Sequence, residues 1–250
     1  MQEDGFEKRL LELSERARRQ SVYQFTDFLG LPEISAYQKM KKGLFPSDLS
    51  GGCKDAERQM VRFGSPELFG YEEPFPITCM QAVPLSHKNA EGFTHRDVLG
   101  SLMHLGIDRS VLGDICVKDG IAYFFCVSRL ENFFSQELVR IRHTMVACSR
   151  AEGIPEHFAG ESREVSLQAE SERVDAVVAK ACHLSRGDSG ELFRQGKVYI
   201  DGILCEKSSR LLQEGEMVSV RGYGRFHFLG VSGLSRKGKK NLLVEIWTAG

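Results

Sequence analysis

The sequence predicts an α+β protein made of three successive parts, at about residues 1–72, 73–160 and 165–250. An amphipathic helical pattern occupies the N-terminus, strand-like and helix-like segments alternate in the middle, and a short helix precedes a hairpin near the C-terminus. A chain of 250 residues is long enough for two or three separate cores. We therefore expect a mostly helical N-terminal region followed by two domains that mix helices and strands.

The N-terminal region shows apolar residues at three- and four-residue spacing, namely Phe6, Leu10, Leu13 and Ala17. This spacing predicts an amphipathic helix over residues 5–20. A second helix is expected over residues 33–42, and a third starts near Asp55 after a turn at residues 51–52. Arg16, Arg18 and Arg19 on the first helix could meet RNA, but such a cluster is more often a solvated helix face.

The middle part alternates between the two periodicities. Strands are predicted at residues 77–83, 114–117, 121–127 and 144–148, and helices at residues 94–104 and 130–140. The resulting order β-α-β-β-α-β is the ferredoxin-like pattern, which also underlies the RNA recognition motif. Tyr123 and Phe125 fall on one face of their strand and Phe124 on the other, so only one face could stack bases. A core role is the commoner one for such a strand.

The C-terminal part holds the most informative segment, LSRGDSGELFRQGKVYIDG, at residues 184–202. Ser185 can cap a short helix that ends at Gly196, and residues 197–200 read as a strand before an Asp201-Gly202 turn. Upstream, valines and alanines at helical spacing follow Arg173. A strand at residues 217–220 and a basic tail, SRKGKK, follow the hairpin.

The basic residues of this part favour contact with phosphate. Residues 171–250 carry 13 Lys and Arg against 9 Asp and Glu, whereas the whole chain has a net charge of -1. Local rather than global positive charge suggests a local nucleic-acid contact, although chance asymmetry could also produce it. We expect Arg186, Arg194 and Lys197 to lie close together on the helix and hairpin, where they would form a footprint suited to phosphate.

In its order of elements, the segment from Arg173 to Lys240 resembles the S-four (αL) RNA-binding domain, which is named for a small-subunit ribosomal protein. Two residues depart from the pattern: Gly190 stands where a longer, often basic side chain is common, and Asp201 replaces the usual Asn of the turn. The resemblance implies an RNA-binding surface. It comprises Arg173, Ser185, Arg186, Ser189, Arg194, Gln195, Lys197, Asp201, Arg221, Arg225, Lys237, Lys239 and Lys240.

Three further strings extend a resemblance over nearly the whole chain: GGCKDAER, THRDVLGSLMHLGIDRSVLGDI and RGYGRF…GLSRKGKK. Together they are similar to the YlmH family of bacterial RNA-binding proteins. The resemblance implies a middle domain like the RNA recognition motif and a C-terminal S-four domain. It further implies binding to rRNA of the large ribosomal subunit and to tRNA during rescue of stalled translation, with a link to cell division in some members.

Enzymatic readings have weaker support. The sequence contains no P-loop, G-x-S-x-G or H-E-x-x-H string, and the Gly222/Gly224 pair runs into a strand rather than a helix. His95 and Asp97 could form a catalytic cluster, but Thr94 with Asp97 also makes an ordinary helix start. We expect no catalytic residue and no cofactor. An RNA-modifying enzyme, of the pseudouridine synthase or methyltransferase type, is the alternative.

The cysteine content and the lack of long apolar runs indicate the cellular compartment of the protein. Seven cysteines occur without a C-x-x-C pair, which favours reduced, buried thiols, and the scattered histidines predict no metal site. No apolar run is long enough to span a bilayer, and the charged N-terminus does not read as a signal peptide. The expected location is the cytoplasm.

Overall fold

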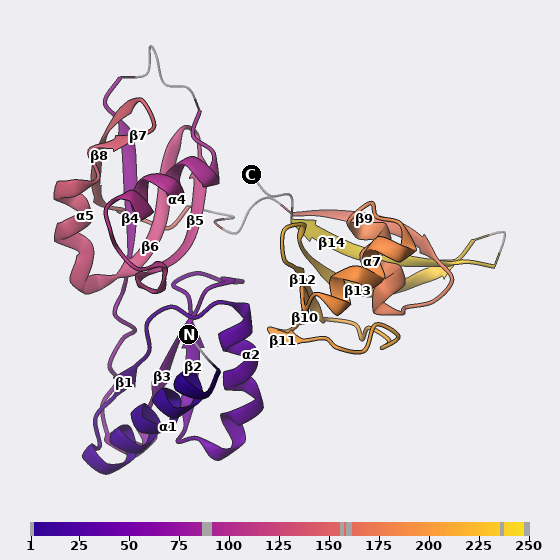
Figure 1. Cartoon of the computed structure of the whole chain (residues 1–250), viewed down its shortest axis with the longest axis horizontal. Coiled ribbons are helices and arrows are strands. Elements are labelled where there is room, and N and C mark those ends of the chain that lie inside the picture. Colours follow the sequence, from indigo (N-terminus) through magenta and orange to yellow (C-terminus); the bar gives the residue numbers. More distant parts are fainter. Residues whose placement is uncertain (1–2, 87–91, 156–157, 159–161, 236–237, 248–250) are drawn as a thin grey trace. The chain divides into compact units, whose positions relative to one another are not determined.

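The computed structural model describes residues 3–86, 92–155, 158, 162–235 and 238–247 (Figure 1). The chain divides into two compact units, residues 1–159 and residues 160–249, hereafter unit 1 and unit 2. Helices and antiparallel sheets occur in both, so the α+β class is confirmed. The finer division of residues 1–160 into two domains stays a prediction.

The N-terminal part of unit 1 combines helices with a three-stranded sheet. Its elements are α1 (Glu3–Gln20), β1 (Gln24–Phe25), α2 (Leu31–Met40), η1 (Lys41–Gly43), β2 (Ser47–Ser50), β3 (Met60–Phe63) and α3 (Pro66–Phe69). The strands pair antiparallel in the order β1-β3-β2. Leu10, Tyr37 and Phe63 are fully buried in the core between them. The region holds more helix than strand, as predicted, and its three short strands were missed, because strands of two to four residues are too short to show a period of two.

No helix starts at Asp55. Asp55 has a left-handed backbone, with φ of 58°. The Asp114 carboxylate accepts the backbone N–H groups of Glu57 and Arg58 at 2.7 and 3.0 Å. Because a distant carboxylate takes these donors, the segment is a loop that docks on the next part of the chain.

The rest of unit 1 is built on a five-stranded antiparallel sheet. Its elements are β4 (Ile77–Pro84), α4 (His95–His104), η2 (Arg109–Val111), β5 (Leu112–Lys118), β6 (Ile121–Val127), η3 (Ser128–Leu130), α5 (Glu131–Glu137), β7 (Arg140–Ile141) and β8 (Thr144–Arg150). The strand order is β5-β6-β4-β8-β7. The predicted element order is present, except that α5 ends three residues early and the short β7 precedes β8.

Both faces of β6 are covered. On one face, Phe124 packs edge-on against Phe134 of α5, with ring centroids 5.2 Å apart. On the other, Phe125 is 1% exposed and lies 4.6 Å from the Phe158 ring. Gly52 also lies on this ring, because an added Cβ there would stand 2.6 Å from it. Phe125 is therefore a core residue, and of the two aromatic residues on this face only Tyr123 is partly exposed.

Unit 2 consists of two helices packed against a six-stranded antiparallel sheet. Its elements are β9 (Ser162–Ala169), α6 (Val174–Ala181), α7 (Arg186–Arg194), β10 (Val198–Ile200), β11 (Ile203–Leu204), β12 (Met217–Val220), β13 (Gly224–Leu234) and β14 (Lys240–Trp247). The strand order is β11-β10-β12-β13-β14-β9. Its core includes Val177 and Leu192 of the helices and Phe226 of the sheet. The sheet is larger than predicted, and SRKGKK is not a tail, because its last residue, Lys240, begins β14.

Candidate nucleic-acid interface

The start of α7 is fixed by a side-chain cap. The Ser185 hydroxyl accepts the backbone N–H of Asp188 at 3.1 Å and donates to the Asp188 carboxylate at 2.6 Å. Arg186 follows in the first turn with an exposed side chain. The uncapped N–H groups of a first turn and the helix dipole both favour an anion at this place.

A second cation lies near the same helix start. Arg173 precedes α6 and binds Asp175, with Nη2 and Oδ2 2.7 Å apart. The hydrogen bond from Arg173 contributes most to a lowered pKa of Asp175, and the charge of Arg186 adds a smaller part. The Ser189 hydroxyl of α7 donates to the Asp175 backbone carbonyl at 2.8 Å, so the starts of α6 and α7 are neighbours. The structure brings together two predicted residues from the starts of two helices.

The placement of Ser189 is a correction. Ser189 is fully buried, and its hydroxyl donates to the Asp175 backbone carbonyl at 2.8 Å. A side chain in that position ties α7 to α6 and cannot reach RNA. Helix periodicity could have indicated it, because Ser189 lies three residues before the buried Leu192.

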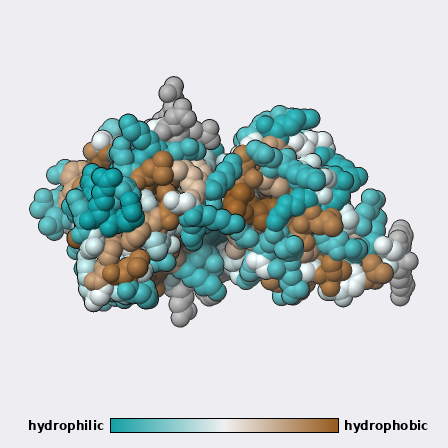
Figure 2. Space-filling view, turned by 90° about the horizontal axis from the view of Figure 1, so that it is seen from below, coloured by the Kyte–Doolittle hydropathy of each residue, from teal (hydrophilic) through white to brown (hydrophobic). Residues whose placement is uncertain are grey.

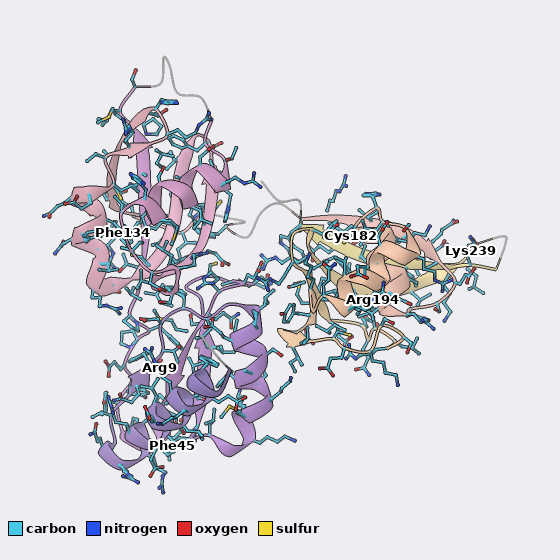
Figure 3. The ribbon with its side chains drawn as sticks, in the orientation of Figure 1. Arg9, Phe45, Phe134, Cys182, Arg194 and Lys239 are labelled. Carbon is cyan, nitrogen blue, oxygen red and sulfur yellow. The ribbon has the colours of Figure 1, made fainter. Side chains whose placement is uncertain are left out.

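The opposite end of α7, about 12 Å away at 1.5 Å per residue, carries a different arrangement. Arg194 (labelled in Figure 3) donates to the Glu191 carboxylate at 2.7 Å, and the Gln195 amide donates to it at 3.0 Å. These hydrogen bonds lower the pKa of Glu191, with the Gln195 bond first. Arg194 therefore has a carboxylate partner within its own helix, as Arg173 has one in Asp175.

The hairpin that follows α7 continues the basic surface. The backbone carbonyl of Lys197 accepts the N–H of Arg221 at 2.9 Å, so the β12–β13 turn lies beside the start of β10. Asp201 and Gly202 have φ of 49° and 77°, the two positive values of a type I′ turn. The Asp201 carboxylate accepts the N–H of Met217 at 2.9 Å. Asp201 thus supports the hairpin, which is a structural role.

The lysines near the β13–β14 connection differ among themselves. Lys240 forms an ion pair with Glu172 at 2.7 Å, and this hydrogen bond lowers the pKa of Glu172. Lys239 is exposed next to it (Figure 3). Lys237 lies outside the described residues. Of the three predicted lysines, Lys240 forms a structural ion pair that connects β14 to the residue before Arg173, near the start of α6.

One partner was missed by sequence reasoning. Arg225 of β13 lies opposite Trp247 of β14, and its guanidinium carbon is 5.4 Å from the centre of the indole ring. Arg225 and Trp247 are 22 positions apart, and the pairing register that places them opposite each other is not visible in the sequence. The alternation of Arg225, Phe226, His227 and Phe228 was the available signal, since it assigns Arg225 to the face away from the core.

The alternative sites in unit 1 have structural partners. Thr94 and Asp97 form the predicted capping box, with Thr94 N–H 2.9 Å from the Asp97 carboxylate. Hydrogen bonds from Thr94 lower the pKa of Asp97, so this carboxylate is a weak base. Partial burial and, secondarily, the charge of Arg109 lower the pKa of His95. Each of these groups has a plain structural explanation.

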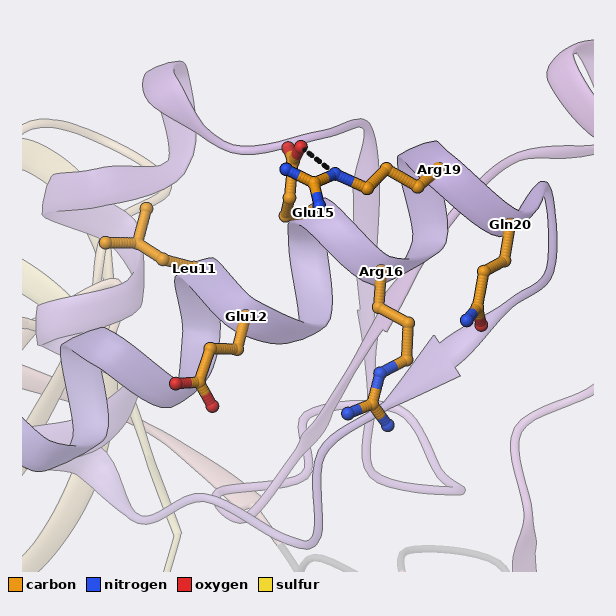
Figure 4. A pocket seen from close by; sticks show the side chains of 6 residues that line it. All are labelled: Leu11, Glu12, Glu15, Arg16, Arg19 and Gln20. Atoms are coloured by element: carbon orange, nitrogen blue, oxygen red, sulfur yellow. Dashed lines mark hydrogen bonds and ion pairs between the residues drawn. The ribbon is translucent and has the colours of Figure 1, made fainter.

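The outer face of α1 is solvated. A shallow depression there is lined by Leu11, Glu12, Glu15, Arg16, Arg19 and Gln20 (Figure 4). Arg18 and Arg19 both pair with Glu15, at 2.7 and 2.6 Å. Two of the three arginines considered for RNA are therefore paired within their own helix.

The described residues contain neither a cluster of metal ligands nor a membrane-spanning helix. No three His, Cys, Asp or Glu side chains of the described ranges come close enough together to hold a metal ion. No helix among the described residues is long and apolar enough to cross a membrane. On the surface shown in Figure 2, hydrophobic residues form separate patches among hydrophilic ones.

Comparison with known proteins finds two kinds of similarity to one family. A family model described as "Putative RNA-binding domain in YlmH" matches residues 72–153. The chain is 25% identical over 249 residues to the ribosome-associated protein quality control protein P2 of Bacillus subtilis (strain 168), covering 97% of this chain and 95% of that protein. The cell division protein ylmH from Streptococcus pneumoniae, a solved structure, matches with a TM-score of 0.48 and 18% identity over 60% of this chain and 92% of that one. The family model and the relative that matches along nearly the whole chain both support the YlmH family.

Proposed function

We propose that this protein is a non-catalytic RNA-binding factor that associates with the ribosome and acts in protein quality control. The observation that carries the proposal is the hydrogen bond from Ser189 of α7 to the Asp175 carbonyl of α6, which places the two helix starts, with Arg173 and Arg186, side by side on the more basic unit. Guanidinium groups beside two helix N-termini suit phosphate, which can bind in a bidentate manner. The name of the Bacillus subtilis relative supports the ribosome as the setting.

The fold assignments belong to the same proposal. The strand order β5-β6-β4-β8, with β4 and β6 central, supports a ferredoxin-like middle domain. In unit 2, the succession of α6, α7 and the type I′ hairpin supports an S-four-type domain. An S-four-type domain would recognise structured RNA by phosphates, 2′-hydroxyls and shape rather than by base sequence.

The finer target is inferred from the family resemblance. We assign the RNA to the large ribosomal subunit, with tRNA as a second ligand in the rescue of stalled translation. A link to cell division is consistent with the name of the Streptococcus pneumoniae protein, and the cytoplasm is the location in which ribosomes would be met. Crosslinking of the full-length protein to RNA in cells, followed by sequencing, tests these assignments. Crosslinks in large-subunit rRNA and tRNA are expected, and crosslinks confined to mRNA would contradict them.

The non-catalytic part of the proposal has its own test. Asp97 caps a helix and His95 has a lowered pKa, so neither group is arranged as a strong base. Mass spectrometry of RNA from cells with and without the protein should give identical sets of modified nucleotides. A modification that disappears with the protein, and returns with wild type but not with His95→Ala, would support an enzyme instead.

A further inference from the structure

The N-terminal part of unit 1 carries a chain of aromatic rings that extends from its interior to its surface. Tyr23 lies at the centre, with the ring centres of Phe69 and Tyr71 at 5.0 and 5.2 Å, both edge-on. Phe45 (labelled in Figure 3) continues the chain from Phe69, at 6.0 Å between ring centres. Tyr23 is buried, whereas Tyr71 is 44% exposed and Leu68 is 53% exposed. The chain of rings therefore reaches the surface at Tyr71, close in sequence to an exposed residue of α3.

Tight packing supports these two exposed side chains. An added Cβ at Gly64 would stand 2.3 Å from the Phe69 ring and 2.8 Å from the Tyr23 ring, so Phe69 lies directly on the backbone of Gly64. The Tyr23 hydroxyl donates to the Tyr71 carbonyl at 2.8 Å. Tyr71 and Leu68 are therefore presented on a packed support, and a preformed surface loses little entropy when it binds a partner.

The cation that contacts these rings is Arg62, whose side chain is only 9% exposed. Its guanidinium carbon lies 5.2 Å from the centre of the Tyr23 ring and 5.0 Å from that of Phe75. Arg62 donates to the Asp48 carboxylate at 3.1 Å, and its Nη1 lies 3.5 Å from the Glu72 carboxylate. Two carboxylates thus share one buried guanidinium, while their own side chains are 56% and 68% exposed.

The surface around the rings is acidic. Four exposed carboxylates belong to it, those of Asp48, Glu67, Glu72 and Glu73. Burial raises the pKa of the Tyr23 hydroxyl, and the nearby carboxylates of Glu72 and Glu67 raise it further. The one buried guanidinium balances at most one of the four negative charges. We call this surface the acidic aromatic face, and it comprises Asp48, Glu67, Leu68, Tyr71, Glu72 and Glu73.

The composition of the acidic aromatic face suits a basic protein. Its carboxylates repel the phosphates of RNA. Exposed tyrosine is typical of binding surfaces between proteins, and opposite charges at the rim orient the two partners. A lysine of the partner would place its ammonium group over the Tyr71 ring, next to the Glu72 carboxylate.

We propose that the acidic aromatic face binds a basic segment of another protein, with lysines paired to its carboxylates and an apolar side chain against Tyr71 and Leu68. The proposal goes beyond the proposed function and does not rest on it, because RNA binding is assigned to unit 2 and this face belongs to unit 1. A failure of RNA or ribosome binding would leave the proposal standing.

Binding of a short peptide to the full-length protein tests the proposal. The probe is a fluorescein-labelled peptide in which Lys and Leu residues are spaced by Gly and Ser, and its fluorescence anisotropy reports binding. Glu67→Gln combined with Glu72→Gln should weaken binding up to about tenfold, because two exposed ion pairs are lost. Tyr71→Ala should weaken it about tenfold through loss of the ring.

The matched control removes the same charge from another face of the same unit. Glu7→Gln combined with Glu12→Gln changes two exposed acids of α1, and this variant should bind the peptide as wild type does. Equal weakening by the control would reduce the effect to net charge and overturn the proposal. Wild-type binding by the Glu67 and Glu72 variant and by Tyr71→Ala would overturn it as well.

Further measurements separate the proposed ligand from other occupants of the face. If Tyr71→Ala melts early, Leu68→Ser replaces it and should weaken peptide binding several-fold. Photocrosslinking of a thiouridine-labelled RNA hairpin to residues 67–73 would assign the face to RNA and overturn the proposal. Self-association of the wild type that the Glu67 and Glu72 variant loses, measured by analytical ultracentrifugation, would assign the face to a second copy of the chain, with the same consequence.

Discussion

Single residues of the basic surface differ in how much of their charge remains for a ligand. Glu191 lies against Arg194, and Glu172 lies against Lys240. Arg186 sits at a helix start and has only a minor effect on Asp175. A phosphate would displace a carboxylate to bind Arg194 or Lys240, whereas at Arg186 the helix dipole already favours an anion. Arg186 is therefore the residue on which the account depends most.

Ser189 gives a residue-scale prediction, because its role is structural. Ser189→Ala removes the hydrogen bond to the Asp175 carbonyl and should lower the free energy of unfolding by about 1 kcal/mol. Affinity for structured RNA should not change. Urea unfolding and an RNA titration of the same variant check both statements. An RNA affinity lowered several-fold at unchanged stability would mean that the hydroxyl contacts RNA after all.

At the scale of elements, the loop of residues 51–59 joins the two parts of unit 1. The Arg58 guanidinium donates to the carbonyls of Phe28 and Leu112 at 3.0 and 2.8 Å. Burial lowers the pKa of Arg58, so the contact is shielded from water. Phe28 also enters the core of the five-stranded sheet. The N-terminal elements and the sheet therefore share packing.

A substitution in the first residues of β5 tests this packing between the N-terminal elements and the five-stranded sheet. An added Cβ at Gly113 would stand 2.7 Å from the Phe28 ring and 2.8 Å from Phe125, so Gly113→Ala should destabilise unit 1 by about 1–3 kcal/mol. Gly100 in α4 has open space around it, so Gly100→Ala should stabilise by up to about 1 kcal/mol. Circular dichroism during urea unfolding measures these changes.

Trp247 provides the internal control for that experiment, because it reports on unit 2 alone. Its fluorescence transition should stay in place in both glycine variants. A Gly113→Ala protein that unfolds like wild type by circular dichroism would refute the tight packing of Phe28 and Phe125 against Gly113. A parallel shift of the Trp247 transition would show that the two units unfold together.

The two units give a prediction at the scale of the whole molecule. Unit 2 has its own core and is the more basic of the two units, so residues 160–250 should bind structured RNA with a strong dependence on salt. Residues 1–159 should bind it weakly. Filter binding of both fragments at several salt concentrations checks this. Equal affinities would remove the assignment of RNA binding to unit 2.

Features that depend on residues close in sequence could be predicted, and features that depend on residues far away in sequence could not. The caps at Ser185 and Thr94 and the turn at Asp201 depend on neighbours within three residues or on one backbone conformation, and all three were predicted. The helix expected at Asp55 was wrong because its donors bind Asp114, more than fifty residues away. Ser189 was wrongly assigned to the RNA surface because the packing of α7 on α6 buries it. Trp247 was missed because the register of two strands places it beside Arg225.

The central claim is that the start of α7 contacts RNA through Arg186, and one reversal of charge tests it. Arg186→Glu places a negative side chain where a phosphate would bind, while an exposed change of this kind usually alters stability by no more than about 0.5 kcal/mol. Full-length wild type and variant are compared by co-sedimentation with ribosomes in sucrose gradients and by thermal melts. The account predicts a normal melt and no ribosome-bound variant. A variant that melts normally and still sediments with ribosomes as wild type does would contradict it.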